Sequence, residues 1–145
     1  MKLAMGADHG GYSLKEILKK HLVEAGHEVL DLGTHDTSSC NYPDYAAKVA
    51  YAVADKDADL GVLICGTGIG MSIAANKIHG IRAACCGDTY SAAMTRNHNN
   101  ANVLCLGERV IGYGLALDMV DLFVDTPFEG GRHQRRIDKM MAYEA

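Results

Sequence analysis

The 145-residue sequence contains no tryptophan, only two prolines and only two phenylalanines. It also has no stretch that approaches the roughly 18 consecutive apolar residues needed to cross a bilayer. The start of the chain reaches charged residues too soon for a signal peptide. We therefore expect a cytoplasmic protein without membrane association. Its length and its 48% content of hydrophobic residues predict one domain over residues 1–145 with a substantial core.

Cysteine is present, but the patterns that bind metals or build disulfide frameworks are missing. The five cysteines are odd in number and form neither a Cys-x-x-Cys pair nor a zinc spacing. This usage predicts a reducing compartment and no structural metal site. The net charge of -4 argues against a broad nucleic-acid-binding surface. The cysteines are Cys40, Cys65, Cys85, Cys86 and Cys105.

Apolar segments alternate with amphipathic ones along the whole chain. The order predicts an α/β fold, a three-layer αβα sandwich with a five-stranded parallel sheet that is Rossmann-like. In the first helix, Ser13 and Glu16 fit a capping box and Gly26 fits a C-terminal stop. Strands are predicted at Lys2–Met5, Glu28–Leu32, Val62–Ile64, Ile81–Cys85 and Val103–Leu106. Helices are predicted at Ser13–Ala25, after Asp44, at Met71–Asn76, Tyr90–Arg96, Tyr113–Phe123 and Arg132–Tyr143.

The most informative segment runs from Gly61 to Asn76. A buried strand leads into Cys65, a turn rich in glycine follows, and a helix begins. The glycines allow the backbone to approach a ligand closely, and the free N–H groups of a helix start attract anions. The same field would favour a thiolate at Cys65, which could then serve as base or nucleophile. The alternative is that Cys65 is a small buried apolar residue that ends a strand.

Polar residues follow the predicted strands, where ligands bind in parallel sheets. Asp8, Cys65, His98 and Arg109 are accordingly expected to share one edge. Each also has a purely structural interpretation: Asp8 and His98 could cap or end helices, and Arg109 could form a surface ion pair. Near the C-terminus, Arg132 and Arg136 are four residues apart and could grip one phosphate, or they could lie in a solvated basic helix end.

These motifs together resemble the ribose-5-phosphate isomerase B family over essentially the whole chain. The resemblance implies isomerisation between ribose 5-phosphate and ribulose 5-phosphate without a metal or organic cofactor. It also implies a homodimer with active sites shared between subunits, or a tetramer of two such dimers. Allose- and galactose-6-phosphate isomerases belong to the broader family, so the exact sugar stays open. The motifs are Met5–Tyr12, Tyr42–Asp44, Ile64–Lys77, His98–Asn99, Gly107–Val110 and Gly130–Arg136.

The resemblance also implies roles for individual residues. Cys65 would be the base that moves a proton between C1 and C2 through a cis-enediolate, and Thr67 would move protons between O1 and O2. His98 would open the furanose ring. Some relatives carry a glutamate base where this chain has Met71, so Cys65 is the local candidate here. The substrate ligands would be Asp8, His9, Tyr42, Gly66, Thr67, Gly68, Ile69, Gly70, Asn99, Arg109, Arg132 and Arg136.

Two functions of other classes compete with this interpretation. The strand, glycine turn and helix are reminiscent of a nucleotide-binding module, but the glycine spacing is not Gly-x-Gly-x-x-Gly and no Gly-Lys-Ser/Thr follows. A thiolate and imidazole pair of Cys65 and His98 would suit a redox sensor or a cysteine hydrolase. Covalent trapping of an acyl-enzyme would favour the hydrolase.

Overall fold

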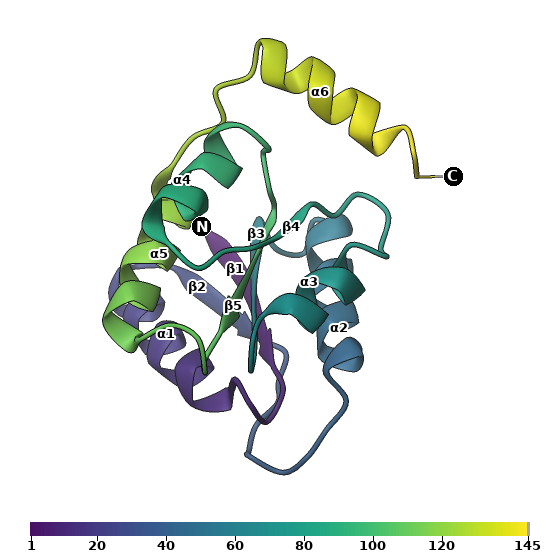
Figure 1. Cartoon of the computed structure of the whole chain (residues 1–145). Helices are drawn as coiled ribbons and strands as arrows, with labels where there is room; N and C mark the ends of the chain where they lie inside the picture. The colour runs from purple at the N-terminus through teal and green to yellow at the C-terminus, as the bar shows by residue number, and fades with distance from the viewer. Residues whose placement is uncertain (145) are drawn as a thin grey trace.

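The computed structural model describes residues 1–144 and centres on a parallel sheet of five strands in the order β2-β1-β3-β5-β4 (Figure 1). All strand pairs are parallel, so every strand ends at the same edge of the sheet. The order of the strands changes direction at β1, because β2 is added on one side of β1 and β3 on the other. The strands are β1 (Lys2–Ala7), β2 (Glu28–Asp31), β3 (Leu60–Cys65), β4 (Ala83–Cys85) and β5 (Val103–Gly107).

Helices cover both faces of the sheet and confirm the three-layer prediction (Figure 1). Side chains of α1, α4 and α5 pack on one face, and those of α2 and α3 pack on the other. Helix α6 lies beyond the edge where the strands begin. No helix within residues 1–144 is both long enough and apolar enough to cross a membrane. The helices are α1 (Tyr12–Glu24), α2 (Tyr42–Ala54), α3 (Ile69–Ala75), α4 (Thr89–Asn97), α5 (Tyr113–Asp125) and α6 (Arg132–Met141).

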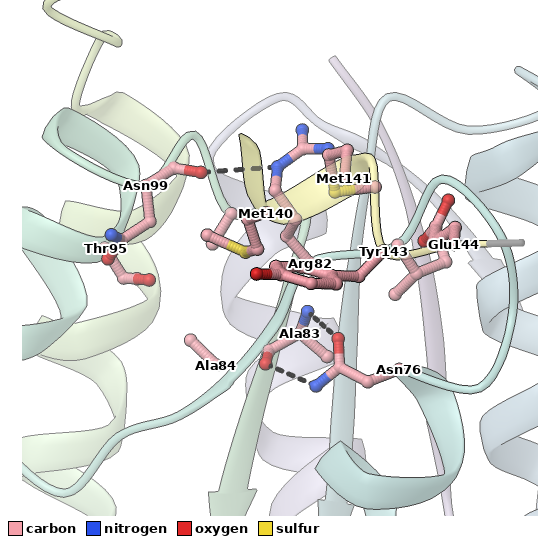
Figure 2. A pocket seen from close by; sticks show the side chains of 12 residues that line it. Asn76, Arg82, Ala83, Ala84, Thr95, Asn99, Met140, Met141, Tyr143 and Glu144 are labelled. Carbon is pink, nitrogen blue, oxygen red and sulfur yellow. Dashed lines mark hydrogen bonds between the residues drawn. The ribbon is translucent and has the colours of Figure 1, made fainter. Parts of the chain in front are cut away.

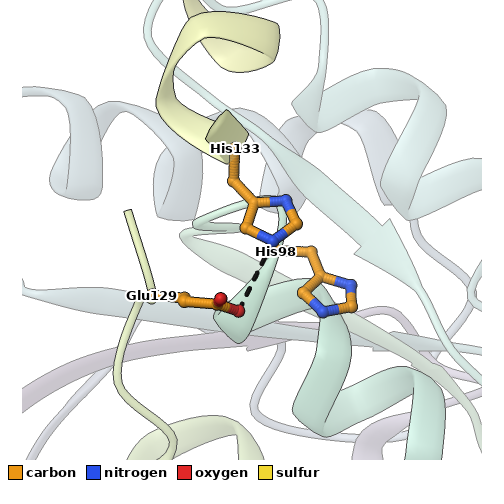
Figure 3. A group of neighbouring side chains, drawn as sticks. All are labelled: His98, Glu129 and His133. Atoms are coloured by element: carbon orange, nitrogen blue, oxygen red, sulfur yellow. Dashed lines mark ion pairs between the residues drawn. The ribbon is translucent and has the colours of Figure 1, made fainter. Parts of the chain in front are cut away.

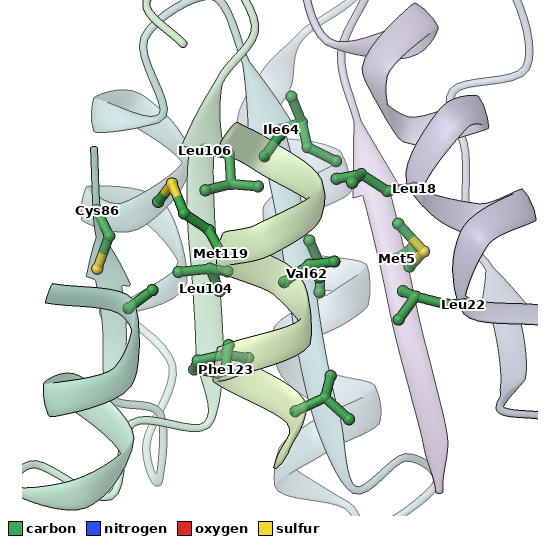
Figure 4. Close-up of a cluster of buried hydrophobic side chains, with 14 of the residues drawn as sticks. Met5, Leu18, Leu22, Val62, Ile64, Cys86, Leu104, Leu106, Met119 and Phe123 are labelled. Carbon is green, nitrogen blue, oxygen red and sulfur yellow. The ribbon is translucent and has the colours of Figure 1, made fainter. Parts of the chain in front are cut away.

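The core consists of two apolar clusters separated by the sheet. Val62 and Ile64 point toward α1 and α5, where they meet Phe123 and Leu18 in the larger cluster (Figure 4). Alternate residues of a strand face opposite sides, so Leu63 and Cys65 belong to the cluster under α2 and α3. This alternation places the Cys65 thiol on the α3 side of the sheet, at the end of a fully buried strand.

One local prediction was wrong. The capping box at Ser13 and Glu16 is not formed, because helix α1 starts at Tyr12 with Gly11 as the N-cap residue and no side chain caps it. The carboxylate of Glu108 instead accepts a hydrogen bond from the Leu14 N–H. The C-terminal stop was correct, since Gly26 follows the helix with a φ of 95° that suits glycine.

Helix α1 also carries a buried cation. The Lys15 side chain is 0% exposed, and its Nζ lies 2.8 Å from both carboxylate oxygens of Asp31 on β2. Glu16 and Lys19 complete the cluster, with Lys19 Nζ 3.0 Å from Asp31. Burial alone would raise the pKa of Asp31, but hydrogen bonds from the two lysines and from the Gly33 N–H lower that pKa to about 2. Asp31 is therefore a carboxylate that ties β2 to α1.

Candidate active site

Three loops meet at the edge where the strands end. The Asp8 N–H, just after β1, donates to the carbonyl of Ile64 at 3.2 Å. The Glu108 N–H, just after β5, donates to the carbonyl of Cys65 at 2.9 Å, and the Arg109 N–H donates to that of Gly66 at 3.1 Å. These backbone bonds fix the loops after β1 and β5 on either side of the Cys65 turn.

The side chains of these loops gather around Gly10. The Gly10 N–H donates to Asp8 Oδ1 at 2.9 Å. A Cβ atom on Gly10 would lie 3.3 Å from Asp8 Oδ1, 3.3 Å from the Gly66 nitrogen and 3.5 Å from Arg109 Nη2. Asp8 is 8% exposed, whereas Arg109 is exposed. The prediction that Asp8, Cys65 and Arg109 share one edge is therefore confirmed by their positions.

The Cys65 thiol is held inside the glycine turn. Its Sγ accepts a hydrogen bond from the Gly68 N–H at 3.1 Å, and the residue is 6% exposed. Gly68 adopts a φ of 81°, which L side chains avoid, so this turn requires glycine at the position that donates to the sulfur. The Ile69 N–H donates to Thr67 Oγ1 at 3.3 Å. Thiol, hydroxyl and the start of α3 thus occupy one short segment, where a backbone donor would stabilise a negatively charged sulfur.

Tyr42, the first residue of α2, lies close to this turn, and His9 follows β1 at the same edge of the sheet. A Cβ atom on Gly70 would come within 2.6 Å of Tyr42 Cε1, so the tyrosine ring rests directly on the turn. His9 Nδ1 accepts a hydrogen bond from the Cys40 N–H at 3.2 Å. This bond fixes the imidazole beside the loop between β2 and α2. Both residues are on the same edge of the sheet as Cys65.

The neighbouring thiols differ from Cys65 in their surroundings. Burial raises the pKa of Cys85, and it raises the pKa of Cys86 to about 11. Burial also raises the pKa of Cys105 far above the ordinary value of a thiol. The Cys85 thiol donates to the Thr67 carbonyl at 3.7 Å. These three cysteines remain neutral thiols near pH 7 and are poor bases there.

The structure contradicts the prediction that His98 and Asn99 lie on the same edge. Helix α4 runs antiparallel to the strands, so its last residues return to the edge where the strands begin. There the carbonyl of Asn99 accepts a hydrogen bond from Arg82, the residue before β4, at 3.3 Å. The length of β3, about 17 Å at the usual rise per residue, separates this edge from Cys65. The prediction was wrong because it treated the end of a helix as the end of a strand.

The two predicted phosphate ligands belong to this opposite edge as well. Arg132 Nη1 lies 3.8 Å from Glu129 Oε1, and the rings of His98 and His133 stack with centroids 4.5 Å apart. Arg132 and Arg136 are both exposed on α6. One chain therefore divides the predicted residues into two groups. Cys65, Asp8, His9, Tyr42, Thr67 and Arg109 form one group, and His98, Asn99, Arg132 and Arg136 form the other.

A pocket of about 440 Å³ opens at the second edge, between α6 and β4 (Figure 2). Its lining includes Met140, Met141 and Tyr143 from the C-terminal part of the chain, together with Arg82 and Asn99. Asn99 is the only predicted site residue that lines it. The thiol, the glycine turn and the arginines of α6 are not among its lining residues, so this pocket alone does not assemble the predicted chemistry.

The prediction from sequence also missed Glu129 and His133, which lie beside His98. Glu129 lies in the segment before α6, and His133 is the second residue of α6. Their spacing of four residues is a weak signal, and only the fold brings them to His98.

Known proteins resemble this chain over nearly its whole length. Residues 3–140 match the model of the family described as Ribose/Galactose Isomerase. The chain is 51% identical over 143 residues to "Ribose-5-phosphate isomerase B" of Escherichia coli K12, covering 99% of this chain and 96% of that protein.

Solved structures of ribose-5-phosphate isomerase B also resemble this chain closely. The structure of Clostridium thermocellum ribose-5-phosphate isomerase B superimposes with a TM-score of 0.98 at 53% identity, covering 99% of this chain and 97% of that one. The Mycoplasma genitalium ribose-5-phosphate isomerase B, solved with bound ribulose-5-phosphate, gives a TM-score of 0.94 at 46% identity, covering 99% and 95%. With the same fold along its whole length and a family match over residues 3–140, the chain belongs to the ribose/galactose isomerase family.

Proposed function

We propose that the protein is an aldose-ketose isomerase that interconverts ribose 5-phosphate and ribulose 5-phosphate, with residues 1–145 acting as one isomerase domain. The observation that carries this proposal is the contact between the Cys65 sulfur and the Gly68 N–H at 3.1 Å, within a turn bordered by Asp8 and Arg109. Relatives at 51% and 53% identity are named ribose-5-phosphate isomerase B, which supports the same activity.

In the proposed mechanism, His98 exchanges a proton with the ring oxygen and O1, and the furanose opens. Cys65 then takes the proton from C2 of the aldose, and the electrons move to form a cis-enediolate. Thr67 passes a proton between O1 and O2, and the Cys65 thiol returns its proton to C1. Donors aimed at oxygens that become negative typically contribute about 3 kcal/mol each. The N–H groups of residues 66–70 would take this role once substrate is bound.

The remaining groups would bind the substrate. Arg132 and Arg136 would hold the phosphate together with His9, while Asp8, Tyr42, Asn99 and Arg109 would contact the sugar. Arginine suits phosphate because its planar guanidinium donates two parallel hydrogen bonds.

We also propose that the active protein is a homodimer, or a tetramer of two dimers. The two groups of residues lie at opposite edges of one chain, so a complete site requires the second group from another copy. A two-fold axis that brings one edge against the other edge of the partner creates two identical sites. Five free cysteines further support a reducing compartment such as the cytoplasm.

A panel of sugar phosphates tests the proposed activity. Purified protein is assayed for ketose formation from ribose 5-phosphate, allose 6-phosphate and galactose 6-phosphate at equal concentrations. We expect the largest kcat/KM with ribose 5-phosphate. Turnover of a six-carbon sugar phosphate alone would show that ribose 5-phosphate is not the substrate. Absence of any ketose would refute the proposal that the protein is an aldose-ketose isomerase.

A further inference from the structure

Three side chains that attract cations converge at the edge where the strands begin. His98 ends α4, Glu129 lies in the segment before α6, and His133 is the second residue of α6 (Figure 3). One ligand atom from each lies within 4.8 Å of the others. The proposed isomerisation uses only His98, so Glu129 and His133 have no role in it.

His133 is the most unusual member of the cluster. Its side chain is 8% exposed, and its Nε2 is buried without a hydrogen-bond partner. The nearest acid is Glu129, whose Oε2 lies 3.4 Å from that nitrogen. Leaving a buried polar atom unpaired costs about 1–3 kcal/mol. The nitrogen therefore makes no hydrogen bond within residues 1–144, and the Glu129 carboxylate is its partner in the ion pair of Figure 3.

The backbone holds the three residues in place while two side chains keep their freedom. The Glu129 N–H donates to the Asn97 carbonyl at 3.0 Å, and the His98 N–H donates to the Met94 carbonyl at 2.7 Å. The first bond joins the segment before α6 to the end of α4, and the second holds His98 on the last turn of α4. Glu129 is exposed and His98 is half-buried, so both side chains can rotate toward His133.

We propose that His98, Glu129 and His133 form a binding site for a divalent transition-metal cation of the zinc class. Two imidazoles and one carboxylate are a donor set found in zinc sites, whereas magnesium and calcium prefer oxygen ligands alone. With bonds of about 2.1 Å, tetrahedral ligands are about 3.4 Å apart. The His133 and Glu129 atoms already have this separation, at 3.4 Å.

Closing the site requires a movement of His98. Its ring now stacks on His133 at an interplanar angle of 16°, an arrangement in which the ring nitrogens do not converge on one point. Rotation of the half-buried His98 out of the stack would bring one of its nitrogens to the metal. Arg132, 3.8 Å from Glu129, competes for the carboxylate and would limit the affinity.

Binding of the metal has a consequence for activity, and this step rests on the proposed function. A metal would occupy the nitrogen lone pair that His98 needs for proton transfer in ring opening. The cation is therefore an inhibitor bound at the edge opposite to the Cys65 of its own chain, and not a cofactor.

Cobalt(II) is a suitable probe because its absorption reports the ligand type. We expect calorimetry of the full-length protein to show one bound Co²⁺ per chain. Glu129→Gln and His133→Gln should weaken binding by at least the roughly tenfold that loss of a supporting group costs. Glu129 is exposed, so Glu129→Gln tests the site even if His133→Gln fails to fold. The control is Asp121→Asn, which removes the other close acid-imidazole pair, His21 and Asp121 at 2.8 Å; its affinity should equal that of the wild type.

Several results would overturn the proposal. These are absence of binding at millimolar Co²⁺, equal affinity in wild type and Glu129→Gln, or a thiolate charge-transfer band that places the metal on cysteine. Co²⁺ should also inhibit the wild type more strongly than Glu129→Gln, and binding without inhibition would overturn the inhibitory role. Calorimetry needs no substrate, so a failed isomerase assay and a failed metal site are separate outcomes.

Discussion

The sulfur of Cys65 lies 3.1 Å from the backbone nitrogen of Gly68, three residues later in the same turn. The contact joins the proposed base to a donor that stabilises its charged form. It also makes the thiol part of a rigid segment, because Gly68 packs against the backbone of Leu106 on β5. Both partners of the contact can be changed by a single substitution.

Cys65→Ser should bind substrate but lose most turnover, because a serine hydroxyl is a far weaker base than a thiolate. We expect kcat to fall about 100- to 10,000-fold with little change in KM. Steady-state kinetics of ketose formation measures the effect. Cys86→Ala is the matched control, since this buried thiol belongs to the cluster on the opposite face of the sheet. Near-normal turnover by Cys65→Ser would refute the assignment of the base.

Gly68→Ala should damage both stability and rate. The residue has a φ of 81°, and a Cβ there would lie 2.9 Å from the Leu106 carbonyl carbon. We expect a loss of about 1–3 kcal/mol in the free energy of unfolding and a roughly 10- to 100-fold lower kcat as the N–H moves away from the sulfur. Gly114→Ala, with no atom within 4 Å of its Cβ, should instead be neutral or stabilising. Denaturant titration measures the free energy of unfolding of both variants, and steady-state kinetics measures their kcat.

Mixing two inactive variants should restore activity if the site is shared. Cys65→Ser and His98→Asn damage residues at opposite edges, so a mixed dimer contains one intact site and one doubly damaged site. After subunit exchange at equal amounts, about a quarter of wild-type activity should return. Mixing Cys65→Ser with Thr67→Val, both on one edge, is the control and should restore nothing. If the first mixture also stays inactive while exchange is verified, each chain must hold its own site.

Arg136→Ala should weaken binding of the phosphate more than it slows the chemical steps. Loss of a hydrogen bond between charged groups predicts a KM raised about 10- to 100-fold. Arg135→Ala provides the comparison, because Arg135 is equally exposed but lies on a neighbouring face of α6. Inorganic phosphate should compete with substrate less effectively in Arg136→Ala than in Arg135→Ala. An unchanged KM for Arg136→Ala would remove this residue from the phosphate site.

Asp31→Asn should destabilise the fold because it leaves Lys15 buried with a weaker partner. Breaking a buried ion pair predicts a loss of about 3 kcal/mol in the free energy of unfolding at pH 7. The pKa of Asp31 is about 2 in the folded protein, below its ordinary value of 3.8. Its contribution to stability is therefore complete above about pH 4 and disappears as the pH falls through 2.

Denaturant titrations between pH 2 and pH 7 test how the stability contributed by Asp31 changes with pH. The difference in stability between wild type and Asp31→Asn should shrink toward pH 2. Glu28→Gln, in the exposed pair 4.0 Å from Lys2, should change stability by less than about 0.5 kcal/mol at any pH. A constant difference for Asp31→Asn across this range would contradict the role of its charge.

Local patterns in the sequence were sufficient for the sheet and for the Cys65 turn. The apolar run at Val62–Ile64 and the glycines that follow are contiguous, so the strand, the turn and the start of α3 could be predicted together. The cluster of His98, Glu129 and His133 could not be predicted, because its members come from segments about 30 residues apart and no periodicity links them. The prediction that His98 lies at the same edge as Cys65 was wrong for a related reason. Helix α4 rises about 13 Å over nine residues, which carries its end across the sheet.

The division of the proposed site between two edges has a consequence for protein engineering. Substitutions that abolish pairing of the chains would be expected to leave the sheet and both half-sites folded, yet produce an inactive monomer. An active single chain would require either a tandem fusion of two copies or the transplantation of an imidazole and two guanidinium groups onto the loops that follow β1, β3 and β5. Catalysis in this family member would then be a property acquired at assembly, and protomer concentration would itself set the amount of enzyme.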